Sequence, residues 1–384
     1  MNIVILYPFY IMKYYIIAGE ASGDLHGANL MKAIKKKDKQ ADFRFWGGDL
    51  MLRESANIAV HYKDIAFMGF WEVITNLDKI LKNIKFCKKD ILHYEPDSIV
   101  FIDYPGFNMR IARWAKEKGF VTQYYVSPQI WAWKENRIKS IKRDIDYLYV
   151  ILPFEKDFYE TKHSFKVDFV GHPLIDAINT FEYQDEASFK ADNDLLDKPI
   201  IALLPGSRKQ EIQKMLSVMM QMAPSFEDYQ FVIAGAPGLT RADYQPFLQK
   251  NNMLLVENKT YNLLHIAHAA LVTSGTATLE TALFEVPQVV CYKGNHLSYL
   301  IAKKIISLKY ISLVNLIMNE EVVKELIQAD FNTDSLKNEL HRILVGKKYT
   351  EIINKYKELK DKLGHQGASQ KTADLIIERT ASKM

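Results

Sequence analysis

The chain has 384 residues, 48% of them hydrophobic and 25% charged, a length and composition typical of a globular protein with two domains. Its formal net charge of +4 is too small to predict a nucleic-acid partner. The two cysteines, Cys87 and Cys291, form neither a metal motif nor a disulfide framework, so a reducing compartment is expected.

Residues 1–11 are apolar, but they lack the basic start and the cleavage site of a signal peptide, and Pro8 interrupts them. Met12 leads directly into the first expected strand. We therefore expect residues 1–11 to be a flexible extension or the result of an upstream start codon. No other stretch reaches the roughly 18 uninterrupted apolar residues of a membrane span.

Short apolar runs separated by helical patterns predict two parallel sheets. Each run is apolar almost throughout instead of alternating, as expected for strands that helices cover on both faces. In residues 12–178 the runs are "YYIIAG", "FRFWGG", "SIVFID", "VTQYYVS", "YLYVIL" and "VDFVGH". In residues 199–350 they are "PIIALLPGS", "YQFVIAGAP", "NMLLVEN", "AALVTSG" and "PQVVCYKG".

The predicted fold class is α/β, with two doubly wound, Rossmann-like domains in tandem. Residues 12–178 form the first domain and residues 199–350 the second. The acidic, polar stretch 179–198 is the predicted linker, and residues 351–384 are expected to be C-terminal helices. Ligands of such folds bind at the carboxyl ends of the strands.

The first strand leads into a helix through "GEASGD", residues 19–24. A strand-to-helix turn with glycines presents free backbone N–H groups to an anion. The stretch is not a dinucleotide fingerprint, since G-x-G-x-x-G is absent, and it is not a P-loop, since no G-K-[ST] follows. It predicts a ligand site without defining the ligand.

Two turns of the second domain have the composition of a diphosphate site. After "IIALLP", Gly206 allows close approach to the backbone, Ser207 adds a hydroxyl, and Arg208 offers a fork of donors to phosphate oxygens. Taken alone, this loop is explained equally well as an ordinary turn with an exposed arginine.

A second turn, residues 273–276, favours the interpretation as a diphosphate site, because a strand, a loop of small residues and a helix again follow one another there. Glu280 lies one helical turn inside this helix, in the apolar context "TLETALF", where it can accept hydrogen bonds from a ribose. Two such loops in one domain predict a nucleotide diphosphate. The turn consists of Thr273, Ser274, Gly275 and Thr276.

The segments "LLPGSR" and "TSGTATLE" resemble the donor domain of glycosyltransferases of the GT-B architecture. Other motifs narrow the resemblance to the lipid-A-disaccharide synthase family, and it spans essentially Met12 to the C-terminus. These motifs are, in chain order, "AGEASGDLHG", "FIDYPGFN", "VSPQIWAW", "LPFE", "GHPL" and "SLVNLI".

The resemblance implies an inverting hexosyltransferase of lipid A biosynthesis. UDP-2,3-diacylglucosamine donates its sugar to 2,3-diacylglucosamine 1-phosphate, which gives a β-1,6-linked disaccharide and UDP. The two domains are then expected to face each other across a cleft, with the C-terminal helices returning to the first domain. The expected location is the cytoplasm, at the inner face of the cytoplasmic membrane as a peripheral protein.

The acceptor's 6-hydroxyl must lose a proton, and Asp103, at the end of "SIVFID", is the candidate catalytic base. An aspartate that only orients its loop is the alternative. The family's loop usually carries a second acid where this chain has Gly106. Glu20 and Asp24 are rival catalytic residues in the first turn, where Ser22 and Gly23 are candidates for acceptor binding.

The departing UDP needs positive potential, which Arg208 and the starts of the two helices can supply without a metal or another cofactor. Two D-x-D triplets, at 144–146 and 192–194, are interpreted as chance matches. Lys293 completes the predicted donor pocket, and Asn315 joins it on the resemblance alone.

Acyl chains need an apolar surface, and residues 65–92 predict one. Their dense apolar start includes Met68, Phe70 and Trp71, a hydrophobic lip that stands beside lysines and suits acyl chains and an anionic membrane. Domain packing, or packing in a homodimer, explains the same residues equally well.

Gln129 and Trp131 in "VSPQIWAW" are further acceptor-site candidates, with core packing as the alternative for the tryptophan. Two other functions share the predicted domain plan. One is a UDP-N-acetylglucosamine 2-epimerase, which acts on a soluble substrate and needs no apolar lip. The other is a nucleotide-sugar-binding module without turnover.

Overall fold

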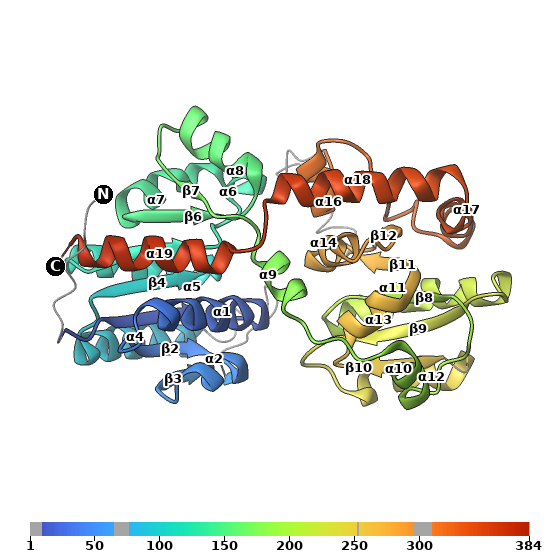
Figure 1. Ribbon diagram of the computed structural model, residues 1–384, viewed down its shortest axis with the longest axis horizontal. Helices are drawn as coiled ribbons and strands as arrows, with labels where there is room; N and C mark the ends of the chain where they lie inside the picture. Colours follow the sequence, from blue (N-terminus) through green and yellow to red (C-terminus); the bar gives the residue numbers. More distant parts are fainter. Residues whose placement is uncertain (1–9, 65–76, 252, 295–308, 384) are drawn as a thin grey trace. The chain divides into compact units, whose positions relative to one another are not determined.

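The computed structural model describes residues 10–64, 77–251, 253–294 and 309–383. The chain divides into two compact units: unit 1 comprises Met1–Ala177 and His365–Met384, and unit 2 comprises Ile178–Gly364. Each unit contains one parallel sheet flanked by helices (Figure 1). The predicted α/β class with two doubly wound domains is confirmed.

The sheet of unit 1 has seven strands in the order β3-β2-β1-β4-β5-β6-β7. The strand order reverses between β1 and β4, and ligands of doubly wound sheets bind at such a switch point. The strands are β1 Lys13–Ala18, β2 Asp42–Gly47, β3 Ile58–His61, β4 Ser98–Ile102, β5 Val121–Tyr125, β6 Tyr147–Val150 and β7 Asp168–Phe169.

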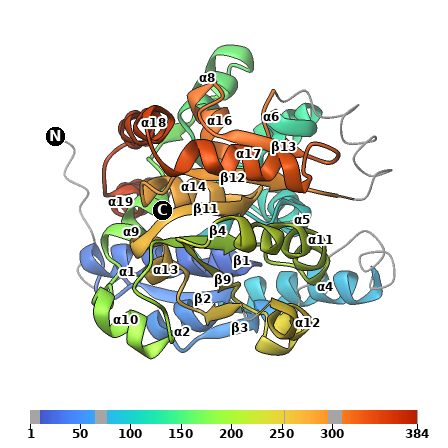
Figure 2. The same ribbon diagram turned by 90° about the vertical axis from the view of Figure 1, so that its right-hand side faces the viewer.

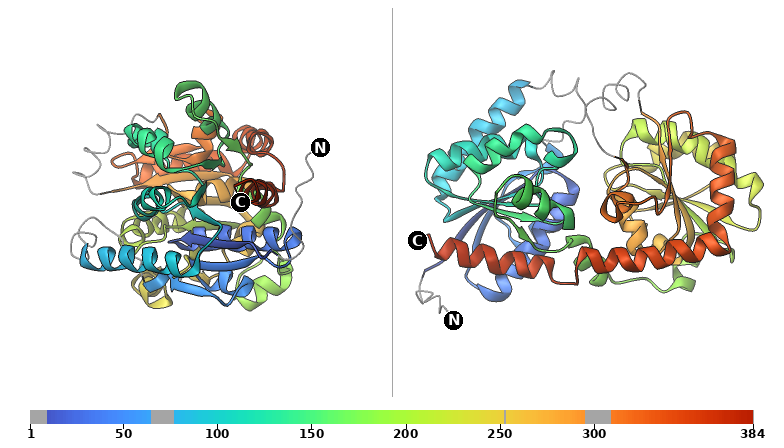
Figure 3. Two further views of the ribbon diagram at one scale, coloured as in Figure 1. Left: turned by 90° about the vertical axis from the view of Figure 1, so that its left-hand side faces the viewer. Right: turned by 90° about the horizontal axis from the view of Figure 1, so that it is seen from above.

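Helices cover both faces of this sheet (Figure 3). Tyr15 and Ile17 of β1 are fully buried in a core cluster with Cys87 of α4, Ile111 of α5 and Ile141 of α7. The alternate residues of β1 are buried as well, and helices α1 and α19 pack together over that face. The described helices of unit 1 are α1 Ala21–Lys37, α2 Asp49–Glu54, α4 Leu77–Tyr94, α5 Pro105–Glu117, α6 Ile130–Trp133, α7 Ile138–Asp144, α8 Pro153–Asp157 and α19 Ala368–Ala381, with short helical turns at Tyr62–Asp64, Glu135–Arg137 and Phe158–Lys162. Helix α9, Pro173–Asn179, contains the boundary between the two units.

The sheet of unit 2 has six strands in the order β10-β9-β8-β11-β12-β13, also between helices (Figure 2). The strands are β8 Ile200–Leu204, β9 Gln230–Gly235, β10 Leu254–Glu257, β11 Ala267–Thr273, β12 Gln288–Tyr292 and β13 Lys324–Ile327. The helices are α10 Glu186–Asp192, α11 Lys209–Met219, α12 Arg241–Asn251, α13 Thr260–Ile266, α14 Thr276–Leu283, α16 Leu313–Met318, α17 Thr333–Leu344 and α18 Lys347–Leu363, with a short helical turn at Met220–Ser225.

Residues 179–198, the expected linker, contain helix α10. The Asp185 side chain caps this helix by accepting hydrogen bonds from the N–H groups of Ala187 and Ser188, both at 3.1 Å. Phe189 is fully buried in the hydrophobic core of unit 2. The polar composition of this stretch therefore reflects a helix with one buried residue, Phe189, and not an unstructured linker. The stretch is a folded part of unit 2.

The C-terminal helices divide between the two units. Helix α18 belongs to unit 2, and the chain enters unit 1 at His365, where α19 packs on α1. The carboxylate of Asp176 caps α19 by accepting hydrogen bonds from the N–H groups of Gly367 and Ser369 at 2.6 and 2.8 Å. Residues 365–384, which contain α19, thus return to the first unit, whereas residues 351–364 remain in the second.

Almost all of the expected extension, residues 1–11, lies outside the described residues. Met12, the first residue after it, is buried. Among the described residues no helix is both long and apolar enough to cross a membrane.

Candidate active site

Asp103 directly follows β4 at the carboxyl edge of the unit 1 sheet. Asp103 and Tyr104 both have left-handed backbone conformations, with φ of 44° and 48°. Each such residue costs about 1–3 kcal/mol, so the surroundings must enforce the conformation. The hydroxyl of Tyr124 and the amide of Asn108 do so by donating to the Asp103 carbonyl oxygen at 2.6 and 2.7 Å.

The first turn of unit 1 packs against this strained segment. A Cβ atom on Gly19 would lie 2.3 Å from the ring of Tyr104, so this position requires glycine. The turn "GEASGD" and the Asp103 loop therefore meet at the switch point of the sheet, as expected for a ligand site.

The environment of the Asp103 carboxyl suits a base. Burial raises its pKa to about 6, the negative charges of Glu20 and Glu155 contribute to the rise, and the backbone N–H of Tyr104 opposes it. At neutral pH the group is ionised in most molecules and still basic enough to accept a proton from a positioned hydroxyl.

The two rival carboxylates of the first turn differ in their surroundings. Glu20 is exposed at the N-terminus of α1 without a capping hydrogen bond, and its charge acts on the pKa of Asp103. Asp24 is buried and accepts three backbone hydrogen bonds, from residues 48, 50 and 51, at 2.7, 3.0 and 3.1 Å. The structure thus assigns Asp24 to capping helix α2, and only Glu20 stays a rival base.

Ser22 and Gly23 lie in the first turn of α1. Ser22 is exposed, whereas Gly23 is buried, and a Cβ on it would lie 3.1 Å from the Cβ of Ala18. Within the described residues the N-cap residue Glu20 makes no side-chain capping bond, so the first N–H groups of this 17-residue helix can serve a polar ligand.

Glu155 of α8 orients the loop that carries Gln129 and Trp131. Its fully buried carboxylate accepts hydrogen bonds from the Ser127 hydroxyl at 2.5 Å and the Trp131 indole at 3.2 Å, and from two backbone N–H groups at 2.9 and 3.1 Å. The Trp131 ring also packs edge-on against Phe154. Trp131 is therefore fixed in place, and Gln129 is exposed beside it.

In unit 2, the turn after β8 holds a carboxylate where a phosphate is expected. Gly206 has a φ of 109°, and the next two residues, Ser207 and Arg208, are exposed. The Ser207 N–H donates to one oxygen of Glu211 at 3.0 Å, and the Arg208 guanidinium donates to the other at 3.3 Å. Both donors are directed to the same anionic group, the geometry that a phosphate also uses.

The turn after β11 is built to leave the start of α14 open. Gly275 has a φ of 155°, a Cβ on it would meet no atom within 4 Å, and in the described part of the chain this N-cap glycine provides no capping side chain. Thr276 is exposed at the first helical position, whereas Thr273 is buried. The Ser274 hydroxyl donates to the carbonyl of Ile311 at 2.9 Å and so ties this turn to the loop before α16.

Glu280 is positioned by an aromatic hydroxyl. Tyr261 of α13 donates to its Oε1 atom at 2.9 Å, and burial raises the pKa of Glu280. The other oxygen, Oε2, receives no hydrogen bond from any described residue. One carboxylate oxygen is thus held in place while the other stays available to a ligand.

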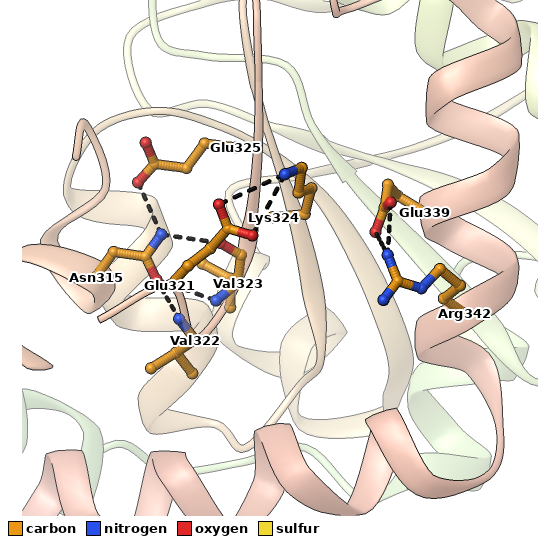
Figure 4. Close-up of polar contacts among 8 residues, drawn as sticks. All are labelled: Asn315, Glu321, Val322, Val323, Lys324, Glu325, Glu339 and Arg342. Carbon is orange, nitrogen blue, oxygen red and sulfur yellow. Dashed lines mark hydrogen bonds and ion pairs between the residues drawn. The ribbon is translucent and has the colours of Figure 1, made fainter. Parts of the chain in front are cut away.

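Asn315 has no free hydrogen-bonding group. Its amide nitrogen donates to Val323 and Glu325 at 2.8 and 2.9 Å, and its oxygen accepts from the N–H groups of Val322 and Val323 at 2.9 and 3.0 Å (Figure 4). Glu325 also accepts the N–H groups of residues 311 and 312, both at 2.9 Å. Asn315 and Glu325 therefore fix the loop that Ser274 contacts.

The remaining predicted residues receive less support. Lys293 is exposed just beyond β12, and Met68, Phe70 and Trp71 lie outside the described residues. In the first D-x-D triplet Asp144 pairs with Arg143 at 2.6 Å, and in the second Asp192 accepts from Gln184 at 2.6 Å. Within the described ranges no group of three acidic, histidine or cysteine side chains is arranged to hold a metal.

Sequence reasoning missed four residues that position these sites, namely Glu155, Glu211, Tyr261 and Glu325. Two of them carried a signal: Glu155 ends the motif "LPFE", and Glu325 is an acid in the strand "KELI". The other two have no distinctive context, because Glu211 and Tyr261 lie in ordinary helical patterns.

Comparison with solved structures places the fold in the class of two-domain α/β proteins with the GT-B architecture. A UDP-GlcNAc 2-epimerase from Neisseria meningitidis, solved bound to UDP-GlcNAc, aligns with a TM-score of 0.68 at 14% identity, over 96% of this chain and 100% of that one. A calicheamicin glycosyltransferase aligns with a TM-score of 0.59 at 13% identity, over 98% and 99% of the two chains.

The sequence comparison is more specific than the fold. The lipid-A-disaccharide synthetase family matches residues 14–379. Lipid-A-disaccharide synthases from Geobacter sulfurreducens and Coxiella burnetii are 36% and 37% identical, each over 94% of this chain and 96% of the relative. The chain belongs to the lipid-A-disaccharide synthase family, and is a glycosyltransferase.

Proposed function

We propose that this protein transfers 2,3-diacylglucosamine from UDP to the 6-hydroxyl of 2,3-diacylglucosamine 1-phosphate, with inversion at the anomeric carbon. Family membership over nearly the whole chain supports the reaction. The observation that carries the catalytic assignment is Asp103, a partly buried carboxyl with a pKa of about 6 in an enforced left-handed conformation.

In the proposed reaction Asp103 accepts the proton of the acceptor's 6-hydroxyl. The oxygen forms a bond to the anomeric carbon of the donor, on the face opposite UDP, and the bond from that carbon to the diphosphate oxygen breaks. UDP leaves with the electron pair of the broken bond. One displacement with a single base inverts the configuration and needs no covalent intermediate on the protein.

Unit 2 supplies the groups that suit the donor. Arg208 and the open start of α14 offer positive potential to the growing charge of the diphosphate. The free oxygen of Glu280 suits a ribose hydroxyl, and the exposed Lys293 is a further donor-site residue. Glu211 must release the Ser207 N–H when a phosphate binds there, because one N–H group cannot fully serve two anions.

Unit 1 supplies the groups that suit the acceptor. The open turn of Ser22 and Gly23 and the fixed indole of Trp131 lie at the carboxyl ends of β1 and β5. Polar donors and an aromatic face are what a sugar requires. Gln129 completes this set as an exposed amide.

We further propose that helix α4 meets the cytoplasmic membrane surface. Leu81, Lys85, Lys89 and Leu92 are exposed and, at spacings of four, four and three residues, share one face of the helix. Exposed leucines flanked by lysines suit an anionic lipid surface. Packing in a homodimer is the competing use of this face, and sedimentation with and without anionic vesicles separates the two.

The test is product formation by the purified protein given both acylated substrates. We expect release of UDP together with a β-1,6-linked disaccharide. Absence of both products contradicts the proposal. Epimerisation of soluble UDP-N-acetylglucosamine would instead support the epimerase, and tight UDP binding without any turnover would support a binding module.

A further inference from the structure

Two cations that pair with no carboxylate of the described residues lie in the tryptophan loop of unit 1. The ammonium of Lys134 is 4.1 Å from the centroid of the Trp133 ring, and the guanidinium carbon of Arg137 is 5.7 Å from it. Trp133 is 48% exposed. The two positive charges therefore lie close to each other near the protein surface, beside a single tryptophan ring.

The neighbouring acid does not neutralise this pair. Glu135, between the two cations in sequence, is bound to Lys162 at 2.7 Å and His163 at 3.0 Å. Among the described residues neither Lys134 nor Arg137 forms an ion pair. Burial and the charge of Arg137 both lower the pKa of Lys134, so the two cations disfavour each other in the absence of an anion.

The cation pair lies at the same sheet edge as the candidate base. Strands β4 and β5 are neighbours in the sheet. Asp103 directly follows β4, and Lys134 and Arg137 lie in the segment that follows β5, so all three lie beyond the carboxyl ends of adjacent strands. Burial raises the pKa of the Tyr124 hydroxyl, and the charges of Asp103 and Arg137 act on it in opposite directions, in keeping with this placement. An acceptor with its reactive hydroxyl at Asp103 can therefore place an anionic group near Arg137.

We propose that Lys134 and Arg137, stacked on Trp133, form the binding site for the phosphomonoester of the acceptor. The inference rests on the proposed function, because that reaction gives the acceptor its phosphate. A guanidinium and an ammonium held side by side on one ring together suit a dianionic phosphate.

The test compares acceptors with and without the 1-phosphate, in uncharged detergent micelles. Lys134→Gln and Arg137→Gln should each raise the KM for the phosphorylated acceptor about 10- to 100-fold and leave the UDP affinity unchanged. Both variants should also lose the wild-type preference for the phosphorylated acceptor. Lys142→Gln, an exposed lysine of α7 without an ion pair among the described residues, is the matched control and should change neither quantity.

Several outcomes would overturn the inference. One is an equal loss of activity with both acceptors, which indicates a structural role. Another is a defect that appears only as weaker binding to vesicles of anionic phospholipid, which assigns the cations to lipid headgroups. Unchanged discrimination between the two acceptors in both variants would contradict it as well.

Direct binding of the acceptor, measured by calorimetry, separates this inference from the proposed reaction. Acceptor binding that depends on Lys134 and on the phosphate supports the inference even if no disaccharide is formed. In that case the proposed function is wrong and the phosphate site stands. If disaccharide forms at the wild-type rate in both variants, the proposed function is supported and the phosphate site is wrong, because the reaction then takes place without this site.

Discussion

At the scale of single residues, Asp103 determines the pH dependence of the proposed reaction. Its pKa of about 6, raised first of all by burial, means that the carboxyl loses its basic form as the pH falls through 6. We expect kcat/KM for disaccharide formation to reach a plateau above pH 7 and to fall about tenfold per pH unit below 6. A profile flat down to pH 4.5 would contradict the role of this group.

The same carboxyl destabilises the folded protein at neutral pH. Its folded pKa lies above the unfolded value, so the stability that it contributes is present at low pH and lost as the pH rises through 6. Asp103→Asn should therefore be more stable than the wild type by at most about 3 kcal/mol above pH 7 and by little near pH 4. Urea denaturation at several pH values measures this difference, and a variant less stable at pH 8 would refute the assignment.

Arg208 is expected to act on the donor alone. Because its guanidinium is 62% exposed and turned to the carboxylate of Glu211, the fold has little need of it. Arg208→Ala should weaken UDP binding about 10- to 100-fold, as measured by calorimetry. The control is Lys209→Ala, which removes an exposed cation that pairs with Asp243 at 2.7 Å and should leave UDP binding unchanged. Equal effects of both variants would indicate only a general loss of positive charge.

At the scale of elements, the loop before α16 depends on Glu325. This carboxylate accepts three hydrogen bonds, of which Figure 4 shows the one from Asn315, and Glu325→Gln replaces an acceptor oxygen by a donor. We expect a loss of about 2 kcal/mol or more in the unfolding free energy, together with weaker UDP binding through the Ser274 turn. Glu321→Gln removes a carboxylate that is exposed and that, among the described residues, pairs with Lys324 alone, so it should cost about 0.5 kcal/mol or less. If Glu325→Gln binds UDP as tightly as the wild type, the loop before α16 does not contribute to the donor site.

The strands show what sequence pattern can and cannot predict. The eleven apolar runs all form strands, because a strand covered by helices on both faces must be apolar along its length. The two strands that the pattern missed, β3 and β13, are edge strands. Both are partly exposed four-residue strands, and "IAVH" and "KELI" contain only three and two apolar residues, so neither has the longer apolar run that the pattern requires.

At the scale of the whole molecule, the sequence predicted the fold class, the family and the loops that carry both candidate sites. It could not predict which polar side chains the fold would use internally. Asp24 and Asn315 are residue types that often bind ligands, yet Asp24 accepts three backbone N–H groups at the start of α2, and Asn315 uses all four of its hydrogen-bonding positions to fix a loop. Such use depends on which backbone N–H groups the tertiary fold brings close.

The same limit explains why Glu155 was missed. In the sequence it is one acid near a helix start, where acidic residues are common. Glu155 accepts hydrogen bonds from the Ser127 hydroxyl and the Trp131 indole. These donors belong to a loop more than 20 residues earlier in the chain, and only the fold brings them close to Glu155. The sequence indicated the loop as a motif, and the structure supplies the reason for its geometry.

The central claim is that Asp103 is the base of a sugar transfer whose donor binds in unit 2. The most direct measurement compares turnover and UDP affinity in Asp103→Asn and in the matched control Glu20→Gln. We expect Asp103→Asn to reduce kcat about 10²- to 10⁴-fold with an unchanged dissociation constant for UDP, and Glu20→Gln to have a much smaller effect. Near-normal turnover in Asp103→Asn would contradict the claim, and a large loss confined to Glu20→Gln would move the base to the first turn.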